Sequence, residues 1–425
     1  MDELIKLWEL FQRPQKPSFH VAEKIILKIV KNQGVCVVGV DVGATFSVFA
    51  IDGQVYKVKH SQLQEFKERL IELASNRRIK LYFEQTGRYS LPIVETFLDI
   101  AELFLVEGKK LKAARELFSA PSKNDYYDAR LLAIIGVLPI SVIPLDYDAY
   151  TLRFLMQRRV RLEKSIQQSI NKIRQCIAVL FPPDYENFNK RNLQKEKTIE
   201  KLKELLKNFT PFSAIQEELL LELKSELQVL ELLLSQKQQL EERVELLSEK
   251  PTIKEDLEIL TSFPGIGKNR ALTLKASYID IRRFPNWKTF IKFMGFTVQD
   301  NQSGTSVKYK KKVNSNRLVR REMYMLCQLF KREDIKNPAA DYYRYYYIKT
   351  GGIDKRAFHK FSVKYLRTIY YCLKHKTKFS PELLQTSLED LISPQTIEEL
   401  RQNVKQLREQ KGKRKKKEGS NGNSN

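Results

Sequence analysis

The sequence contains little of what metal-clustered or disulfide-linked scaffolds require. Its 425 residues include four cysteines and four histidines, and no two cysteines form a Cys-x-x-Cys pair. The cysteines are Cys36, Cys176, Cys327 and Cys372. Their scatter excludes the usual patterns of a structural zinc site and of a disulfide framework. We expect all four to be reduced and mostly buried thiols.

Long apolar runs are also absent. The longest stretch without a charged residue, 131–145, has 15 residues and is interrupted by Gly136, Pro139 and Pro144. A membrane-spanning helix needs about 20 apolar residues, so this stretch does not predict one. The first residues lack a basic segment followed by an apolar run, so we expect no signal peptide. The expected location is the cytoplasm, in association with the nucleoid.

Acidic residues are fewer than basic residues in this chain. The chain has 51 Asp and Glu against 75 Lys and Arg, which gives a formal net charge of +24. Such an excess is typical of proteins that face a polyanion, so nucleic acid is the expected partner. The length suffices for two or three domains, each with its own core.

What the first third of the chain does contain is a pattern of short strands. The β-branched run at 35–41 predicts a strand buried on both faces. Asp52-Gly53 stands between two apolar runs and is a strong hairpin signal. Strands are predicted at 35–41, 46–51, 54–58, 79–84 and 103–106, and helices at 63–73 and 91–102. This order predicts an α/β domain.

Four acidic residues stand at the ends of these elements. Asp41 and Glu84 end two predicted strands, and Asp125 and Asp128 lie one turn apart at the start of an apolar helix. Singly, each has an ordinary explanation as a strand-ending turn or a helix cap. Together they predict one site, because gathered carboxylates repel unless a cation holds them, and Mg²⁺ takes oxygen ligands. Paired ions of this kind serve phosphoryl transfer, and such a sheet describes an RNase H-like nuclease core.

Three motifs around these acids carry a resemblance to a known family. They are V-G-V-D-V-G at Asp41, F-E-Q-T-G-R-Y at Glu84 and K-N-D-Y-Y-D-A at Asp125 and Asp128. The set resembles the RuvC-like DEDD domain of a family of insertion-sequence transposases, which precedes a C-terminal transposase domain. The family usually has Thr where this chain has Asn124. The resemblance implies that the four acids bind Mg²⁺ or Mn²⁺ and are catalytic.

The segment 39–45 also resembles a phosphate loop of actin-like ATPases and sugar kinases. Those enzymes need a second Asp-Gly-rich phosphate loop and a Gly-Gly adenosine loop. The only Gly-Gly pair, Gly351-Gly352, has a basic, tyrosine-rich context with no apolar strand before it. A single short loop of this kind is a weak motif, so the kinase interpretation is disfavoured.

The middle of the chain is predicted to be helical. Residues 149–180 interleave apolar and basic side chains, so one face can pack while the other meets phosphates, although a solvated face explains any single arginine. Residues 220–234 place leucines at alternating steps of three and four, which fits a coiled-coil seam or an intramolecular helical hairpin. Candidate phosphate contacts are Lys123, Arg153, Arg158, Arg159 and Arg161.

The segment 261–268, T-S-F-P-G-I-G-K, resembles a helix-hairpin-helix element. Its turn would offer backbone N–H groups and a helix N-terminus to a DNA phosphate, with Gly265, Gly267 and Lys268 as contacts. An ordinary Pro-Gly turn explains the pattern equally well.

Further motifs match the C-terminal domain of the same transposase family. In order they are P-G-I-G at 264–267, F-P at 284–285, G-F-T at 295–297, S-G at 303–304 and N-R-L-V-R-R at 316–321. The resemblance implies that Ser303 is the nucleophile; Ser306 is the nearest alternative, but no Gly follows it. Basic residues here are candidate DNA contacts: Lys308, Lys310, Lys311, Arg317, Arg320 and Arg321.

Two later segments, 341–349 and 358–376, interleave aromatic and basic residues. Rings can stack on bases while the cations hold phosphates, whereas core packing is expected for about half of the tyrosines.

The predicted domains are a helical extension (1–34), an RNase H-like, RuvC-like α/β domain (35–148), a helical or coiled-coil connector (149–254), a mainly α-helical transposase domain with the helix-hairpin-helix-like element (255–390) and a basic, partly disordered tail (391–425).

The expected function is that of an insertion-sequence transposase or recombinase acting on donor and target DNA. The resemblance further implies a homo-oligomer, a dimer or tetramer, guided by a structured RNA. Two alternatives stay open: a RuvC-like endonuclease that uses water as its nucleophile, and a non-catalytic nucleic-acid-binding protein.

Overall fold

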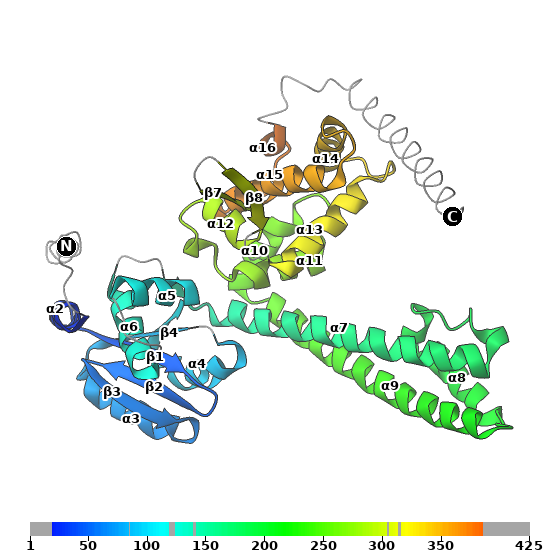
Figure 1. Cartoon of the computed structure of the whole chain (residues 1–425), viewed down its shortest axis with the longest axis horizontal. Helices are drawn as coiled ribbons and strands as arrows, with labels where there is room; N and C mark the ends of the chain where they lie inside the picture. Colours follow the sequence, from blue (N-terminus) through cyan, green and yellow to red (C-terminus); the bar gives the residue numbers. More distant parts are fainter. Residues whose placement is uncertain are drawn as a thin grey trace. The chain divides into compact units, whose positions relative to one another are not determined.

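The computed structural model describes residues 19–84, 86–118, 124–138, 142–303, 306–312 and 316–385. Residues 298–303 and 306–312 are described by their backbone alone. The chain divides into two compact units, Met1–Asp146 and Tyr147–Asn425 (Figure 1). The finer boundaries proposed from the sequence stay predictions. No helix in the described ranges has both the length and the apolar character that crossing a membrane requires.

The first unit is an α/β domain, as predicted, and it is built on one mixed sheet of six strands, the last of which was not predicted. Its strand order is β3-β2-β1-β4-β5-β6. The strands are β1 (Val35–Val42), β2 (Phe46–Ile51), β3 (Gln54–Lys59), β4 (Arg78–Glu84), β5 (Ala101–Val106) and β6 (Ile143–Pro144). The first three run antiparallel, whereas β4 is parallel to β1 and β5 is parallel to β4. The predicted hairpin at Asp52-Gly53 is present, and both residues have positive φ, which suits a two-residue turn.

Helices cover both faces of this sheet. They are α2 (Phe19–Asn32), α3 (Leu63–Ala74), α4 (Leu91–Phe97), α5 (Gly108–Leu117) and α6 (Asp125–Val137). The helices α2, α5 and α6 pack with Val35 and Val37 on one face. On the other face, the ring of Phe49 contacts Phe66 of α3 and Phe97 of α4. Burial on both sides explains the continuous apolar sequence of β1.

Gly39 sets how closely α6 approaches β1. A Cβ at this position would lie 2.0 Å from the carbonyl oxygen of Ala129 and 2.3 Å from the amide nitrogen of Ala133, both in α6. Residues two apart in a strand point to the same face, so Gly39 and Asp41 share the side that faces α6. The absence of a side chain at Gly39 therefore lets the start of α6 lie beside Asp41.

The second unit is mostly helical. Its two longest helices, α7 (Tyr147–Leu180) and α9 (Ala214–Ser248), lie side by side with α8 (Glu196–Asn208) (Figure 1). The leucines of the predicted seam pack on Ile166, Ile170, Ile173 and Ile177 of α7 and on Ile199, Leu202 and Leu206 of α8. The structure thus shows the intramolecular alternative for this seam.

The rest of the second unit surrounds one large core. It contains α10 (Pro251–Thr261), α11 (Lys268–Tyr278), α12 (Trp287–Phe293), the hairpin β7 (Val298–Ser303) and β8 (Ser306–Lys312), α13 (Arg317–Phe330), α14 (Pro338–Lys349), α15 (Asp354–His375) and α16 (Glu382–Gln385). Of the tyrosines at 342–347, Tyr342, Tyr343 and Tyr347 are buried, which agrees with the core role expected for about half of them. The four cysteines are free and buried, as predicted.

Gly39→Ala should destabilise the protein by about 2–3 kcal/mol, because the new methyl group would meet backbone atoms of α6 that cannot rotate away. Urea denaturation followed by circular dichroism measures this loss. Gly267→Ser is the matched control, since a Cβ there would meet nothing within 4 Å. Equal stability of the two variants would contradict the role given to Gly39.

Candidate active site

The four predicted acids of the first unit line one cavity. Because β1 and β4 are parallel neighbours, Asp41 near the end of β1 and Glu84 at the end of β4 lie at the same edge of the sheet. Asp125 and Asp128 belong to the first turn of α6. The cavity has a volume of about 420 Å³, and its lining includes all four acids together with Thr86, Gly108 and Arg115.

Burial and the other three carboxylates of the cavity all raise the pKa of Asp41. It is raised from 3.8 to about 7: burial is the largest cause, the charges of Asp128, Asp125 and Glu84 add to it, and Arg115 opposes the shift. A carboxylate surrounded in this way is poorly neutralised by the protein alone. The cavity therefore favours a proton on Asp41 or an added cation.

Arg115 of α5 is the one basic side chain among the described residues that line the cavity. Its Nε and Nη2 donate to the two carboxylate oxygens of Asp128 at 2.6 and 2.5 Å. The side chain of Asp128 is 2% exposed, so this pairing stabilises a buried charge. Among the described residues, no three His, Cys, Asp or Glu side chains are arranged to enclose a metal ion in this structure.

Asn124, rather than either aspartate, caps α6. Its side-chain oxygen accepts from the amide of Tyr126 at 2.9 Å. The capping explanation for Asp125 and Asp128 therefore does not account for their carboxylates, which line the cavity.

Two further residues shape the cavity beside Glu84. The Oγ1 atom of Thr86 is buried and has no hydrogen-bond partner among the described residues. A Cβ at Gly108 would lie 2.3 Å from Oε1 of Glu84, so Gly108 leaves room for that carboxylate at the start of α5. The donors here are oxygens, which suit a hard divalent cation such as Mg²⁺ or Mn²⁺.

Sequence reasoning missed Arg115, Thr86 and Gly108. Of the three, Thr86 was the easiest to predict from the sequence, because it lies inside the E-Q-T-G-R-Y motif. Arg115 is one of 75 basic residues, and its spacing from Asp128 carries no signal in the sequence.

Comparison with known families gives two matches. Residues 38–182 match the model DEDD_Tnp_IS110, described as a transposase, and residues 257–344 match the model described as Transposase IS116/IS110/IS902 family. Together they span more than half of the chain, and no curated protein is similar enough to count as a match. Both models describe transposases, so the chain is an enzyme that cuts and rejoins DNA. It belongs to the family of DEDD-type insertion-sequence transposases.

The predicted nucleophile lies in the second unit. Ser303 is the last residue of β7 and pairs with Ser306, the first residue of β8. Lys308, Lys310 and Lys311 lie in β8. Gly304 and Lys123 lie outside the described residues.

The turn 264–267 connects α10 to α11 and uses its two glycines differently. Gly265 has a φ of +79°, and a Cβ there would lie 2.5 Å from Leu326, so Gly265 serves packing. Gly267 precedes α11 and faces open space. Lys268 forms an ion pair with Glu245 of α9.

Some of the basic residues predicted to contact nucleic acid are buried or bonded to other groups of the protein, and others are exposed. Arg159 donates to Asn269 at 2.9 Å and pairs with Glu163 and Glu241. Arg320 donates to the carbonyl oxygen of Gly295 at 2.9 Å, and burial lowers its pKa. Burial also lowers the pKa of Arg153, and Arg158 is half-buried. The exposed members are Arg161, Arg317 and Arg321.

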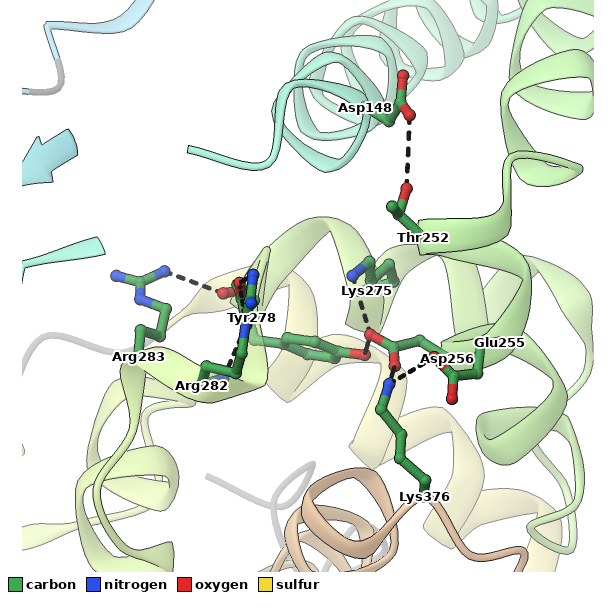
Figure 2. Close-up of polar contacts among 10 residues, drawn as sticks. Asp148, Thr252, Glu255, Asp256, Lys275, Tyr278, Arg282, Arg283 and Lys376 are labelled. Atoms are coloured by element: carbon green, nitrogen blue, oxygen red, sulfur yellow. Dashed lines mark hydrogen bonds and ion pairs between the residues drawn. The ribbon is translucent and has the colours of Figure 1, made fainter. Parts of the chain in front are cut away.

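A buried polar network holds α10 and α11 together (Figure 2). Oδ2 of Asp256 accepts from Nζ of Lys275 and from the hydroxyl of Tyr278, both at 2.8 Å. Lys376, at the end of α15, approaches Oδ1 at 3.3 Å. Asp256 and Lys275 are 3% and 2% exposed, so each charge depends on the other.

Asp256→Ala should therefore destabilise the protein by about 3–5 kcal/mol, because the buried ammonium of Lys275 would lose its ion pair with Asp256. Glu255→Gln is the control, since it removes only an exposed pair with Lys376 and should change stability by less than about 1 kcal/mol. Thermal and urea unfolding measure both changes. If Asp256→Ala were no more damaging than Glu255→Gln, the network would not hold these helices.

The pKa of Asp41 predicts how stability depends on pH without metal. Because that pKa is raised on folding from 3.8 to about 7, the favourable contribution is complete below about pH 4 and is lost as the pH rises through 7. In EDTA at pH 8, Asp41→Asn should be more stable than the wild type by on the order of 1 kcal/mol, allowing for partial exposure. At pH 4 the two should be equal.

Urea denaturation at both pH values checks this expectation. Glu95→Gln removes an exposed carboxylate of α4 outside the cavity lining, and should change stability by less than about 0.5 kcal/mol at either pH. A less stable Asp41→Asn protein at pH 8 would show that the carboxylates do not repel.

Proposed function

We propose that this transposase cuts and rejoins DNA with a cation held by Asp41, Glu84, Asp125 and Asp128 and with Ser303 as the nucleophile, guided by a structured RNA. The observation that carries the proposal is the gathering of four carboxylates in one cavity, where their charges and burial raise the pKa of Asp41. Raised pKa values of this origin cluster at functional sites.

The strand arrangement supports an RNase H-like, RuvC-like assignment for the first unit. An antiparallel β1-β2-β3 meander is extended by parallel β4 and β5, and the acids lie at the ends of β1 and β4 and at the start of α6. This is the arrangement proposed from the sequence for a nuclease core.

The four acids are the residues that would hold Mg²⁺ or Mn²⁺. When bound, the ion would stabilise negative charge on the scissile phosphate. Asp41 must lose its proton to act as a ligand, which its pKa of about 7 permits near neutral pH. Arg115 orients the buried carboxylate of Asp128 through two hydrogen bonds. Thr86 offers a hydroxyl with no partner among the described residues.

Ser303 would form the covalent bond to DNA. Its Oγ would attack the phosphorus of a backbone phosphodiester, the deoxyribose oxygen would leave and take up a proton, and a phosphoserine would result. Rejoining would reverse this step with a different DNA hydroxyl. A serine hydroxyl is a weak nucleophile, so it needs a neighbouring base or metal.

Nucleic-acid binding would use the basic surface of both units. Exposed Arg161, Arg317 and Arg321 are available for phosphates, and the open Gly267 at the N-terminus of α11 supports the helix-hairpin-helix assignment. The net charge of +24 is compatible with binding both DNA and a guide RNA. A homo-oligomer acting on nucleoid DNA in the cytoplasm completes the proposal.

Replacing the serine separates this proposal from a RuvC-like nuclease that uses water. Ser303→Ala should abolish a covalent protein–DNA product that survives SDS and heat, while Ser306→Ala, the neighbour paired with it across the hairpin, should retain it. Radiolabelled DNA followed by gel electrophoresis measures the product. Cleavage that persists in Ser303→Ala would favour water as the nucleophile.

Asp41→Ala tests whether the protein acts by catalysis. Its strand exchange should fall by more than about a hundredfold, because the central carboxylate of the cavity is lost. Full activity of this variant would favour a non-catalytic binding protein.

Sequencing the RNA that copurifies with the protein tests the proposed guide RNA. A discrete RNA is expected, and random fragments would contradict the guided model.

A further inference from the structure

A second cavity lies within the second unit, between helices that follow the turn at 264–267 in the sequence. It is formed by α12, α14 and α15 and has a volume of about 650 Å³, within the range of ~300–1,000 Å³ typical of small-ligand sites. Its lining consists of Trp287, Tyr342, Tyr346, His359, Lys360, Val363, Lys364 and Arg367. The lining thus combines aromatic rings with basic groups, and none of the described lining residues carries a carboxylate.

The basic groups come from one face of α15. Lys360, Lys364 and Arg367 are spaced by four and three residues, so they are neighbours on the helix surface. None of the three forms an ion pair within the described ranges of the chain. Burial and the charge of Arg367 lower the pKa of Lys364. The cavity therefore concentrates positive charge that the surrounding protein does not balance.

The aromatic groups present flat surfaces to the same space. The guanidinium of Arg367 lies 4.7 Å from the ring centre of Trp287. Tyr346 is half-buried, and its hydroxyl lies 3.3 Å from that of Tyr342. By contrast, Tyr343 packs on Phe361 in the core. Trp287 and Tyr346 thus keep part of their surface outside the core, beside unbalanced cations.

We propose that this cavity binds one unpaired nucleotide of a single-stranded segment, with the base against Trp287 and Tyr346 and its phosphates at Lys360, Lys364 and Arg367. Aromatic rings beside a basic track are the means by which proteins bind single strands. A base inside a duplex has both faces covered by its neighbours, so only an unpaired base can enter. This inference rests on the proposed function, since it takes nucleic acid as the substrate.

Tryptophan fluorescence provides a direct readout, because the chain has only two tryptophans, Trp8 and Trp287. In the full-length Trp8→Phe protein, Trp287 is the sole reporter. Ten-nucleotide single strands of DNA and of RNA should quench its emission. A duplex of the same sequence and an abasic single strand should not, because neither presents a free base.

Charge variants test the phosphate contacts without disturbing the core. Lys360→Gln/Lys364→Gln in the Trp8→Phe background should weaken single-strand binding roughly tenfold. Lys355→Gln/Lys374→Gln, which removes the same charge from exposed positions of α15 outside the cavity, should weaken it less than twofold. Circular dichroism confirms that both variants fold.

The outcomes distinguish a DNA strand from a guide RNA as the occupant of the cavity, and they distinguish the cavity proposal from the recombinase proposal. Quenching by DNA alone assigns the cavity to a DNA strand, quenching by RNA alone assigns it to the guide, and either result supports the inference. No quenching, equal quenching by abasic or duplex probes, or equal weakening by the two charge variants overturns it. The covalent Ser303 product is measured separately, so loss of the cavity proposal leaves the recombinase proposal standing.

Discussion

Repulsion among four carboxylates at one edge of a sheet is the constraint on which the first unit depends. Parallel strands bring Asp41 and Glu84 to the same edge, and α6 adds Asp125 and Asp128. The close approach of α6 to β1 requires a glycine at position 39, and the carboxylate of Glu84 requires a glycine at position 108. Among the described residues that line the cavity, Arg115 is the one cation, and its effect on Asp41 is outweighed, because the pKa of Asp41 is still raised to about 7. A site arranged in this way gains from a bound cation.

Basic residues serve two different purposes in the second unit. Arg159 and Arg320 form contacts within the protein, and Lys275 is neutralised by buried Asp256. They stabilise the scaffold and contribute little to an external field. Among the described candidates, Lys360, Lys364 and Arg367 on α15 and the exposed Arg161, Arg317 and Arg321 are free to face an external phosphate. Net charge alone therefore overstates the surface that meets nucleic acid.

Strands β1 to β5, the Asp52-Gly53 hairpin and the positions of the four acids were predictable because each depends on local pattern, whereas β6, β7 and β8 were not predicted. The helix expected at 91–102 was too long: α4 ends at Phe97, and Ala101 already pairs with β4. Pairing with a strand distant in sequence overrides local helical periodicity there. The leucine seam was ambiguous for a similar reason, since sequence spacing does not reveal whether the partner helix is α7 or another chain. Arg115 and the cavity at Trp287 were missed because several elements build them, and only folding brings those elements together.

The central claim is that the acid cavity binds a divalent cation in competition with a proton on Asp41. Calorimetric titration with Mn²⁺ at pH 7, in two buffers of different ionisation enthalpy, measures binding and the protons released together. Binding to the wild type should release protons, because a pKa of about 7 leaves Asp41 partly protonated there, and Asp41→Asn should bind weakly with no release. Absence of Mn²⁺ binding, or equally tight binding by Asp41→Asn, would contradict the account.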